Sequence, residues 1–189
     1  MATWVIISGS PYAKGKCAAV AKRLVDLLND SDQTTAATLF SCATETVQGC
    51  IGCDECKSDL TCIYDDDFPE LSHAIDKADA VMVISPIYFA GVPSQLKALL
   101  DRFQPYFWKR QQQMAAGLFR PTKRPLYVAL IGEGGDPYGT DPARAQIASP
   151  FALADYAVRC HREFIKTDTD AIYAELSRLV LSANKEFSQ

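Results

Sequence analysis

Four cysteines lie close together in the middle of the chain and form its sharpest chemical pattern. Cys50, Cys53 and Cys56 are separated by two residues each, and Cys62 follows after five more. Thiolates at such gaps can converge on one small object, and ferredoxin-type runs use the same tight opening to hold a [4Fe-4S] cluster. The spacing therefore predicts that these four cysteines are the ligands of a [4Fe-4S] cluster.

Two other interpretations of the four cysteines stay open. Zinc accepts four cysteine ligands, although structural zinc sites usually pair two short Cys-x-x-Cys knuckles across a longer gap. The thiols can also remain free or form a redox-active pair. The other three of the seven cysteines are Cys17, Cys42 and Cys160, which we expect to be small buried or half-buried side chains.

A second chemical pattern follows the first apolar run of the chain. Residues 9–16 combine glycine, serine and lysine and lead into a helix-like pattern. A strand-to-helix turn presents unpaired backbone N–H groups at the positive end of the helix dipole, which suits a phosphate. The segment has no G-x-G-x-x-G motif, which disfavours classical dinucleotide binding, and no P-loop ending, which disfavours nucleotide hydrolysis. The alternative to a phosphate site is an ordinary turn. The candidate phosphate-binding residues are Ser8, Ser10, Lys14, Gly15, Lys16 and Cys17.

Strand and helix patterns alternate along the chain. We expect strands at residues 3–8, 36–40, 80–85, 126–131 and 160–165. We expect helices at residues 17–28, 65–78, 93–103, 142–158 and 169–185. The acidic run 65–67 is interpreted as a helix cap rather than a cation site, and the glutamines 111–113 as a solvated helix end or loop.

The alternation predicts a parallel, doubly wound α/β sheet. Such sheets bind ligands in the crevice at the carboxyl ends of their strands. Three loops with unusual composition follow predicted strands and would meet at that edge: residues 9–16, 86–92 and 132–140.

Three segments resemble one known family. Residues 9–11 (Gly-Ser-Pro), before a polar stretch and a helix, are similar to the phosphate loop of NAD(P)H-dependent FMN reductases and their flavodoxin-like relatives. Residues 85–93 resemble the Ser-Pro-x-Tyr segment of that family, and residues 96–103 resemble its Leu-Lys…Asp-Arg helix. The resemblance spans about residues 3–136. At Cys17 the chain lacks the hydroxyl that the family's Gly/Ser-Asn-Thr loop ending commonly supplies.

The resemblance implies a flavodoxin-like three-layer sandwich with a five-stranded parallel sheet in the order 2-1-3-4-5. Residues 1–189 would form a single FMN-binding domain with a cysteine-rich loop at about 49–64. The spacing of the four cysteines also resembles the compact motif of iron-sulfur flavoproteins, which belong to the same flavodoxin-like group. The isoalloxazine ring would lie against two loops that contain Pro86, Ile87, Tyr88, Phe89, Gly91, Gly132, Gly134 and Gly135.

Composition restricts the partners. With 189 residues, 48% of them hydrophobic and 22% charged, the chain fits an ordinary globular domain, and its net charge of −4 argues against nucleic acid. The longest apolar run, residues 80–92, is too short to span a bilayer, and the first residues show no targeting pattern. We therefore expect a cytoplasmic protein without a membrane partner, and the resemblance implies a homodimer or homotetramer.

The preferred hypothesis is an FMN-dependent oxidoreductase of the NAD(P)H:acceptor or FMN reductase type. NAD(P)H would be the co-substrate. Electrons would leave to a small molecule or a protein, and a [4Fe-4S] cluster would relay them. The flavin carries the chemistry, so no catalytic triad is expected, and His73 and His161 are not assigned to catalysis. The alternatives are an electron-transfer flavoprotein without nicotinamide activity and a thiol or zinc redox sensor on the same scaffold.

Overall fold

The computed structural model describes residues 1–31, 34–119 and 123–187. One parallel sheet has the strand order β2-β1-β3-β4-β5, which confirms the predicted flavodoxin-like topology. Its strands are β1 (Ala2–Ser8), β2 (Thr35–Ser41), β3 (Ala80–Pro86), β4 (Arg124–Gly132) and β5 (Tyr156–Ile165). The described helices are α1 (Lys16–Ser31), α2 (Cys56–Asp59), α3 (Phe68–Lys77), α4 (Ser94–Asp101), α5 (Gln104–Ala115), α6 (Asp141–Leu153) and α7 (Thr169–Phe187).

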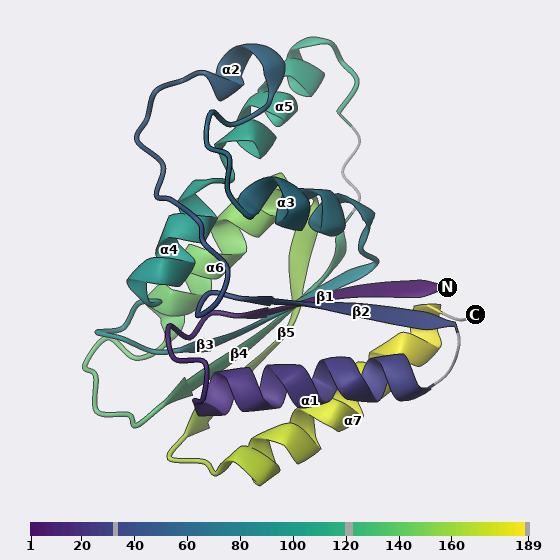
Figure 1. Ribbon diagram of the computed structural model, residues 1–189, viewed down its shortest axis with the longest axis vertical. Helices are drawn as coiled ribbons and strands as arrows, with labels where there is room; N and C mark the ends of the chain where they lie inside the picture. The colour runs from purple at the N-terminus through teal and green to yellow at the C-terminus, as the bar shows by residue number, and fades with distance from the viewer. Residues whose placement is uncertain (32–33, 120–122, 188–189) are drawn as a thin grey trace.

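Helices cover both faces of the sheet and make the predicted three layers. Figure 1 shows α1 and α7 on one face and α3, α4 and α6 on the other, with α2 and α5 together at one end of the molecule. Each central strand contributes side chains to two hydrophobic cores, because successive side chains point to opposite faces of the sheet. In β1, for example, Trp4 and Ile6 pack on the α1/α7 side while Val5 and Ile7 pack on the α3/α4/α6 side.

The terminal helix α7 closes the α1 side of the sheet. Ile172, Leu176 and Val180 recur at helical spacing and are fully or almost fully buried. Asn184, in its last turn, accepts a hydrogen bond from Trp4 Nε1 at 3.2 Å and so ties the end of the chain to the first strand. In the part of the chain that the structure describes, no helix combines the length and the apolar character that crossing a bilayer requires.

The border between α6 and β5 differs from the prediction. We expected a helix to residue 158 and a strand from 160, whereas α6 ends at Leu153 and β5 begins at Tyr156. Asp155 has φ 64° and turns the chain between them. The Tyr156 hydroxyl then lies 2.7 Å from the Ile75 carbonyl oxygen and 2.8 Å from that of Ala78, which is tertiary contact that local periodicity does not reveal.

The sequence pattern did not indicate α5, the helix that follows α4. Residues 111–113 lie in the C-terminal part of α5 and are largely exposed, as predicted for a solvated helix end. Tyr106 is its one buried residue, so α5 lacks the apolar stripe by which an amphipathic helix is recognised. The cysteine segment, expected to be irregular, contains the single turn α2, which packs near α5.

Gly9 sets how closely the β1–α1 loop approaches α4. A Cβ at this position would lie 2.5 Å from Leu96 Cδ2 and 3.2 Å from Ser85 Oγ. Leu96 is fully buried, so its side chain has little space in which to move. Glycine at position 9 therefore lets the end of β1 pack against the helix that follows β3.

Gly9→Ala is expected to lower the free energy of unfolding by about 1–3 kcal/mol, because it overpacks this contact. Urea unfolding measures the change. Gly49→Ala is the matched control, since a Cβ there meets nothing within 4 Å. Equal stabilities of the two variants would contradict the prediction.

Candidate functional site

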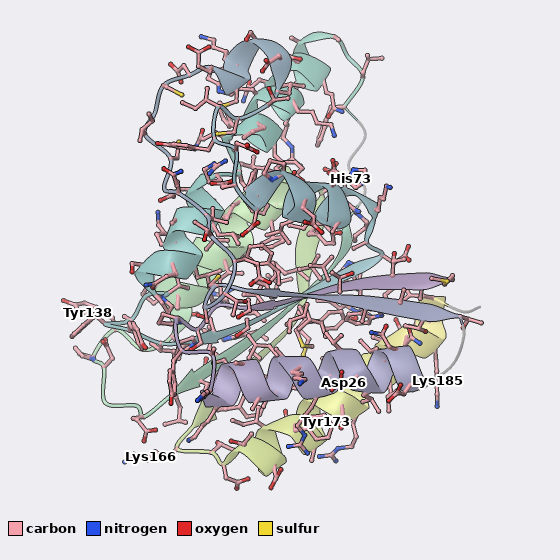
Figure 2. The ribbon with its side chains drawn as sticks, viewed as in Figure 1. Asp26, His73, Tyr138, Lys166, Tyr173 and Lys185 are labelled. Atoms are coloured by element: carbon pink, nitrogen blue, oxygen red, sulfur yellow. The ribbon has the colours of Figure 1, made fainter. Side chains whose placement is uncertain are left out.

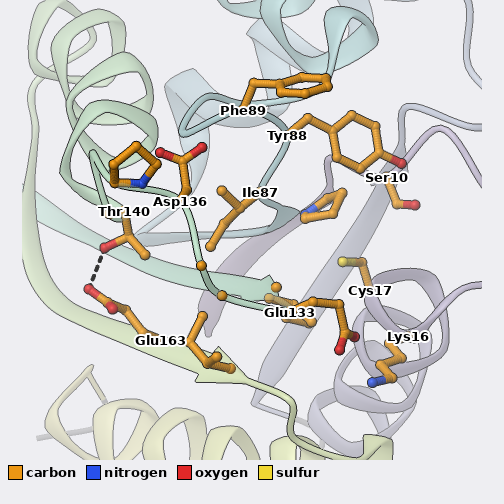
Figure 3. A pocket seen from close by; sticks show the side chains of 18 residues that line it. Ser10, Lys16, Cys17, Ile87, Tyr88, Phe89, Glu133, Asp136, Thr140 and Glu163 are labelled. Carbon is orange, nitrogen blue, oxygen red and sulfur yellow. Dashed lines mark hydrogen bonds between the residues drawn. The ribbon is translucent and has the colours of Figure 1, made fainter.

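A cavity of about 690 Å³ opens at the carboxyl ends of β1, β3, β4 and β5 (Figure 3). The three loops that we expected to meet at this edge all contribute to its wall, together with the end of β5. The predicted residues that line it are Ser10, Lys16, Cys17, Pro86, Ile87, Tyr88, Phe89, Gly132, Gly134 and Gly135. The topology alone thus brings together segments more than a hundred residues apart in sequence.

Four predicted residues do not line the cavity. Ser8 is fully buried inside the sheet, and Lys14 is exposed on the first loop. The Gly15 N–H donates to the Tyr12 carbonyl oxygen at 3.1 Å, and Gly91 forms backbone hydrogen bonds with Tyr88. These residues shape the loops that carry the lining residues.

The first turn of α1 forms one end of the cavity. Its leading backbone N–H groups have no partner within the helix, and they lie at the positive end of the helix dipole. Lys16 lines the cavity beside them and donates from Nζ to the Thr167 carbonyl oxygen at 3.0 Å. Burial raises the pKa of Cys17 to about 12, so its thiol stays neutral and places no negative charge at this end.

The β3–α4 loop presents two aromatic rings at the rim. Tyr88 and Gly91 exchange two backbone hydrogen bonds of 2.9 Å across Phe89 and Ala90, whose φ angles are 49° and 59°. Two successive left-handed residues of this kind define a type I′ turn, which non-glycine residues adopt at a cost of order 1–3 kcal/mol each. The turn leaves Phe89 fully exposed and Tyr88 half-exposed, with both rings at the mouth of the cavity (Figure 3).

The β4–α6 loop needs its glycines. Gly134 and Gly135 have φ angles of 77° and 88°, which glycine adopts without strain. A Cβ on Gly134 would also lie 2.8 Å from Ile165 Cγ2 at the end of β5. The backbone of this loop therefore runs close against the neighbouring strand end and forms one wall of the cavity.

Three acidic residues line the cavity that sequence reasoning did not single out. Glu133 and Asp136 lie in the glycine-containing loop, and Glu163, on β5, accepts a hydrogen bond from Thr140 (Figure 3). Glu133 and Asp136 are adjacent to glycines that we had selected as cofactor-binding residues, and this proximity could have identified them from the sequence. Glu163 lies near the end of the strand that we predicted at residues 160–165, so its place at the carboxyl edge was the available signal, although we had not selected any loop or side chain after that strand.

The two histidines lie on different elements of the fold. Figure 2 shows His73 on α3, away from Tyr138 of the β4–α6 loop. His161 lies on β5 with Nε2 3.7 Å from Glu163 Oε1. Burial lowers the pKa of His161 and outweighs the opposing effect of Glu163, so its imidazole is mainly neutral at pH 7.

A second cavity, of about 230 Å³, is lined by all four clustered cysteines. Cys50 and Cys53 are exposed, Cys56 is buried and Cys62 is half-buried. Burial, then Cys62, then Cys50 and Cys53 raise the pKa of Cys56, as expected for thiols that face a common space. Among the described residues no three metal-ligating side chains are gathered around one centre, so the cysteines share a cavity without closing on a point.

A buried ion pair connects the residues that precede and follow the cysteine segment. Arg102, which follows α4, donates from Nη1 to Asp66 Oδ2 at 2.6 Å and to the Gln48 carbonyl oxygen at 3.0 Å. Asp66 also accepts from the backbone N–H groups of Gln48 and Phe68, at 3.0 and 3.1 Å. Both ends of the segment are thereby joined. Asp67, the N-cap residue of α3, makes no capping bond from its side chain, and Asp66 accepts from the Phe68 N–H instead, so the predicted cap differs from the one observed.

Comparison with known proteins bears on both cavities. Residues 2–155 match the model of a family described as NADPH-dependent FMN reductase. An iron-sulfur flavoprotein of Methanocaldococcus jannaschii is 34% identical over 99 residues, which cover 52% of this chain and 50% of the relative. One from Methanosarcina thermophila is 32% identical over 96 residues, covering 51% and 49%. The chain thus spans about half the length of the curated relatives it matches.

Solved structures share the fold at low sequence identity. A putative quinone reductase from Klebsiella pneumoniae aligns with a TM-score of 0.65 and 13% identity over 97% of this chain and 85% of that chain. An FMN-dependent NADH-azoreductase from Bacillus anthracis, solved with FMN, aligns with a TM-score of 0.62 and 13% identity over 100% of both chains.

The buried ion pair predicts how stability responds to acid. Burial by itself raises the pKa of Asp66, but hydrogen bonds from Arg102, Gln48 and Phe68 outweigh it, so the pKa lies below its ordinary value. An unfolded aspartate titrates near pH 3.9, so the ionised group stabilises the fold fully above about pH 4 and loses this contribution as the pH falls through the folded pKa. We expect Asp66→Asn to lower the free energy of unfolding by about 3–5 kcal/mol at neutral pH, with a gap to wild type that narrows below about pH 4.

Urea unfolding at a series of pH values measures this gap. Asp65→Asn is the control, because Asp65 is exposed and adjacent in sequence, and it should follow the wild type throughout. A gap between Asp66→Asn and wild type that stays constant on acidification would refute the assignment of acid sensitivity to this pair.

Proposed function

The chain belongs to the NADPH-dependent FMN reductase family, and on that premise we propose that it is an FMN-dependent oxidoreductase which takes electrons from NAD(P)H and passes them to an acceptor. The observation that carries the proposal is the cavity at the carboxyl edge of the sheet. This one cavity is lined by the N-terminus of a helix, a lysine, a glycine-containing loop and, at its rim, two aromatic side chains.

The residues at one end of the cavity suit the FMN phosphate. The backbone N–H groups of the first α1 turn would bind it, as helix N-termini bind anions generally. Lys16 adds a positive charge, and the neutral Cys17 thiol adds no repulsion. Ser10 Oγ already accepts from the Tyr12 N–H at 3.1 Å, so its main role would be to fix the local turn of this loop.

The remaining walls suit a flat ring. Gly134 and Gly135 allow backbone to approach a ligand closely, while Pro86 and Ile87 form the wall that follows β3. The Ile87 N–H donates to the Ile131 carbonyl oxygen at 2.9 Å, which fixes the two walls relative to each other. Bound there, FMN would supply hydride and electron transfer, and the protein would bind, orient and shield it.

We further propose that Cys50, Cys53, Cys56 and Cys62 hold a [4Fe-4S] cluster that relays single electrons. Four thiols on one cavity are the donor set such a cluster needs, and the similar relatives are named iron-sulfur flavoproteins. The cysteine cavity and the flavin cavity have no lining residue in common, so the two cofactors would occupy separate sites. A homodimer or homotetramer in the cytoplasm is part of the same proposal.

The first test is an anaerobic absorption spectrum of freshly purified protein, with FMN and iron quantified on the same sample. We expect flavin bands, a broad visible absorbance from the cluster and about four irons per chain. Adding NADH or NADPH without oxygen should then bleach the flavin rapidly. Flavin without iron would leave an FMN reductase with free or redox-active cysteines, flavin that neither nucleotide reduces would leave an electron-transfer protein, and colourless protein would reject the proposal.

Lys16→Gln tests the phosphate end of the cavity. A charge-assisted hydrogen bond contributes about 1.5–3 kcal/mol, and partial exposure reduces this, so we expect FMN affinity to fall about tenfold. Riboflavin affinity should not change, because riboflavin lacks the phosphate. Lys14→Gln is the matched control and should bind both ligands like wild type, since Lys14 lies outside the cavity wall. Equal losses for FMN and riboflavin in Lys16→Gln would place the phosphate elsewhere.

A further inference from the structure

Arg102 lies on the wall of the cysteine cavity and is almost completely buried. Its side chain is 1% exposed, and it lines this cavity together with the four cysteines. The Tyr64 and Phe68 rings each lie 5.0 Å from its Cζ atom, so aromatic groups flank the guanidinium. A full positive charge is therefore held beside four potential thiolates.

Of the three guanidinium nitrogen atoms of Arg102, Nε is the one without a hydrogen-bond partner among the described residues. Nη1 binds Asp66 and the Gln48 carbonyl oxygen, and Nη2 reaches the other Asp66 oxygen at 3.3 Å. Nε is buried and finds no acceptor among the described residues. Leaving a buried donor unpaired is costly, more so when it is charged, so such atoms are rare without a ligand or water.

We propose that Arg102 is a positioning residue of the cysteine site, whose Nε donates a hydrogen bond to a sulfur atom of the bound cluster and thereby raises the cluster's reduction potential. The inference rests on the proposed function, in which the four cysteines hold a [4Fe-4S] cluster. The unpaired Nε and the shared cavity carry it, and the Asp66 pair explains why the side chain cannot turn away.

The direction of the effect follows from charge. Reduction adds one electron to the cluster and makes its sulfur atoms more negative, with no bond formed or broken and no proton required. A fixed N–H donor and a positive charge stabilise the reduced form more than the oxidised form, and hydrogen bonds to sulfur are an established determinant of cluster potentials. Without the Nε donor the cluster should be harder to reduce.

The experiment compares Arg102→Lys with wild type as cluster-containing, FMN-loaded protein. Lysine keeps the charge and can keep an ion pair with Asp66, but it has no donor at the Nε position. Anaerobic titration with dithionite, followed by electron paramagnetic resonance and absorbance, measures the cluster and flavin potentials on one sample. We expect a more negative cluster potential at unchanged iron content, and an unchanged flavin potential, because Arg102 does not line the flavin cavity.

Arg110→Lys is the matched control. Arg110 also pairs with an aspartate, Asp155 at 2.7 Å, but it does not line the cysteine cavity, so both potentials should stay at their wild-type values. An Arg102→Lys protein with full iron content and an unchanged cluster potential would overturn the inference while leaving the proposed function intact. Wild-type protein that binds flavin but no iron would overturn the cluster itself, and the inference with it.

A second variant keeps the inference testable if Arg102→Lys does not assemble the cluster. The double change Arg102→Gln with Asp66→Asn removes both charges together, so neither is left buried alone. The potential of its cluster should also be more negative than that of wild type. A merely structural role for Arg102 would lower stability in these variants without moving the potential, and that result counts against the proposal.

Discussion

The buried ion pair between Arg102 and Asp66 is the interaction on which the cysteine segment depends. Taking two charges out of water is expensive, and a pair of this kind persists where further hydrogen bonds satisfy it. Here the backbone N–H groups of Gln48 and Phe68, at the two ends of the segment, donate these hydrogen bonds to Asp66. Arg102 then links Asp66 and the Gln48 carbonyl oxygen to the end of α4. A stretch with little regular structure of its own is thereby given one position on the fold.

The two cavities owe their shape to different physical causes. The cavity at the carboxyl edge of the sheet is a product of topology, because parallel strands that end at one edge place their loops together whatever those loops contain. The cysteine cavity lies outside the sheet, between a loop with one helical turn and the Gln104–Pro105 start of α5. It therefore depends on particular side chains rather than on the fold class.

Sequence reasoning succeeded where local pattern and topology decide the outcome. The runs that became β1 and β3 are apolar on both faces, and three distinctive strand-end loops met as the parallel sheet requires. It failed where contacts between distant residues decide: α5 has no apolar stripe, and the start of β5 depends on Tyr156 reaching α3. The Arg102–Asp66 pair joins residues 36 apart, and neither residue's local sequence indicates its partner.

The proposed phosphate end of the cavity at the sheet edge shows why a departure from a family motif need not remove a site. Backbone N–H groups at the start of α1 are present whatever side chain follows, so a cysteine in place of a hydroxyl removes one donor and leaves the main ones. Burial keeps the Cys17 thiol neutral. A neutral thiol does not repel a neighbouring anion, whereas a thiolate would. Of the three carboxylates that line the cavity, those of Asp136 and Glu163 lie away from α1, whereas that of Glu133 points toward Lys16 and Cys17, so the Lys16 charge faces both Glu133 and the proposed phosphate (Figure 3).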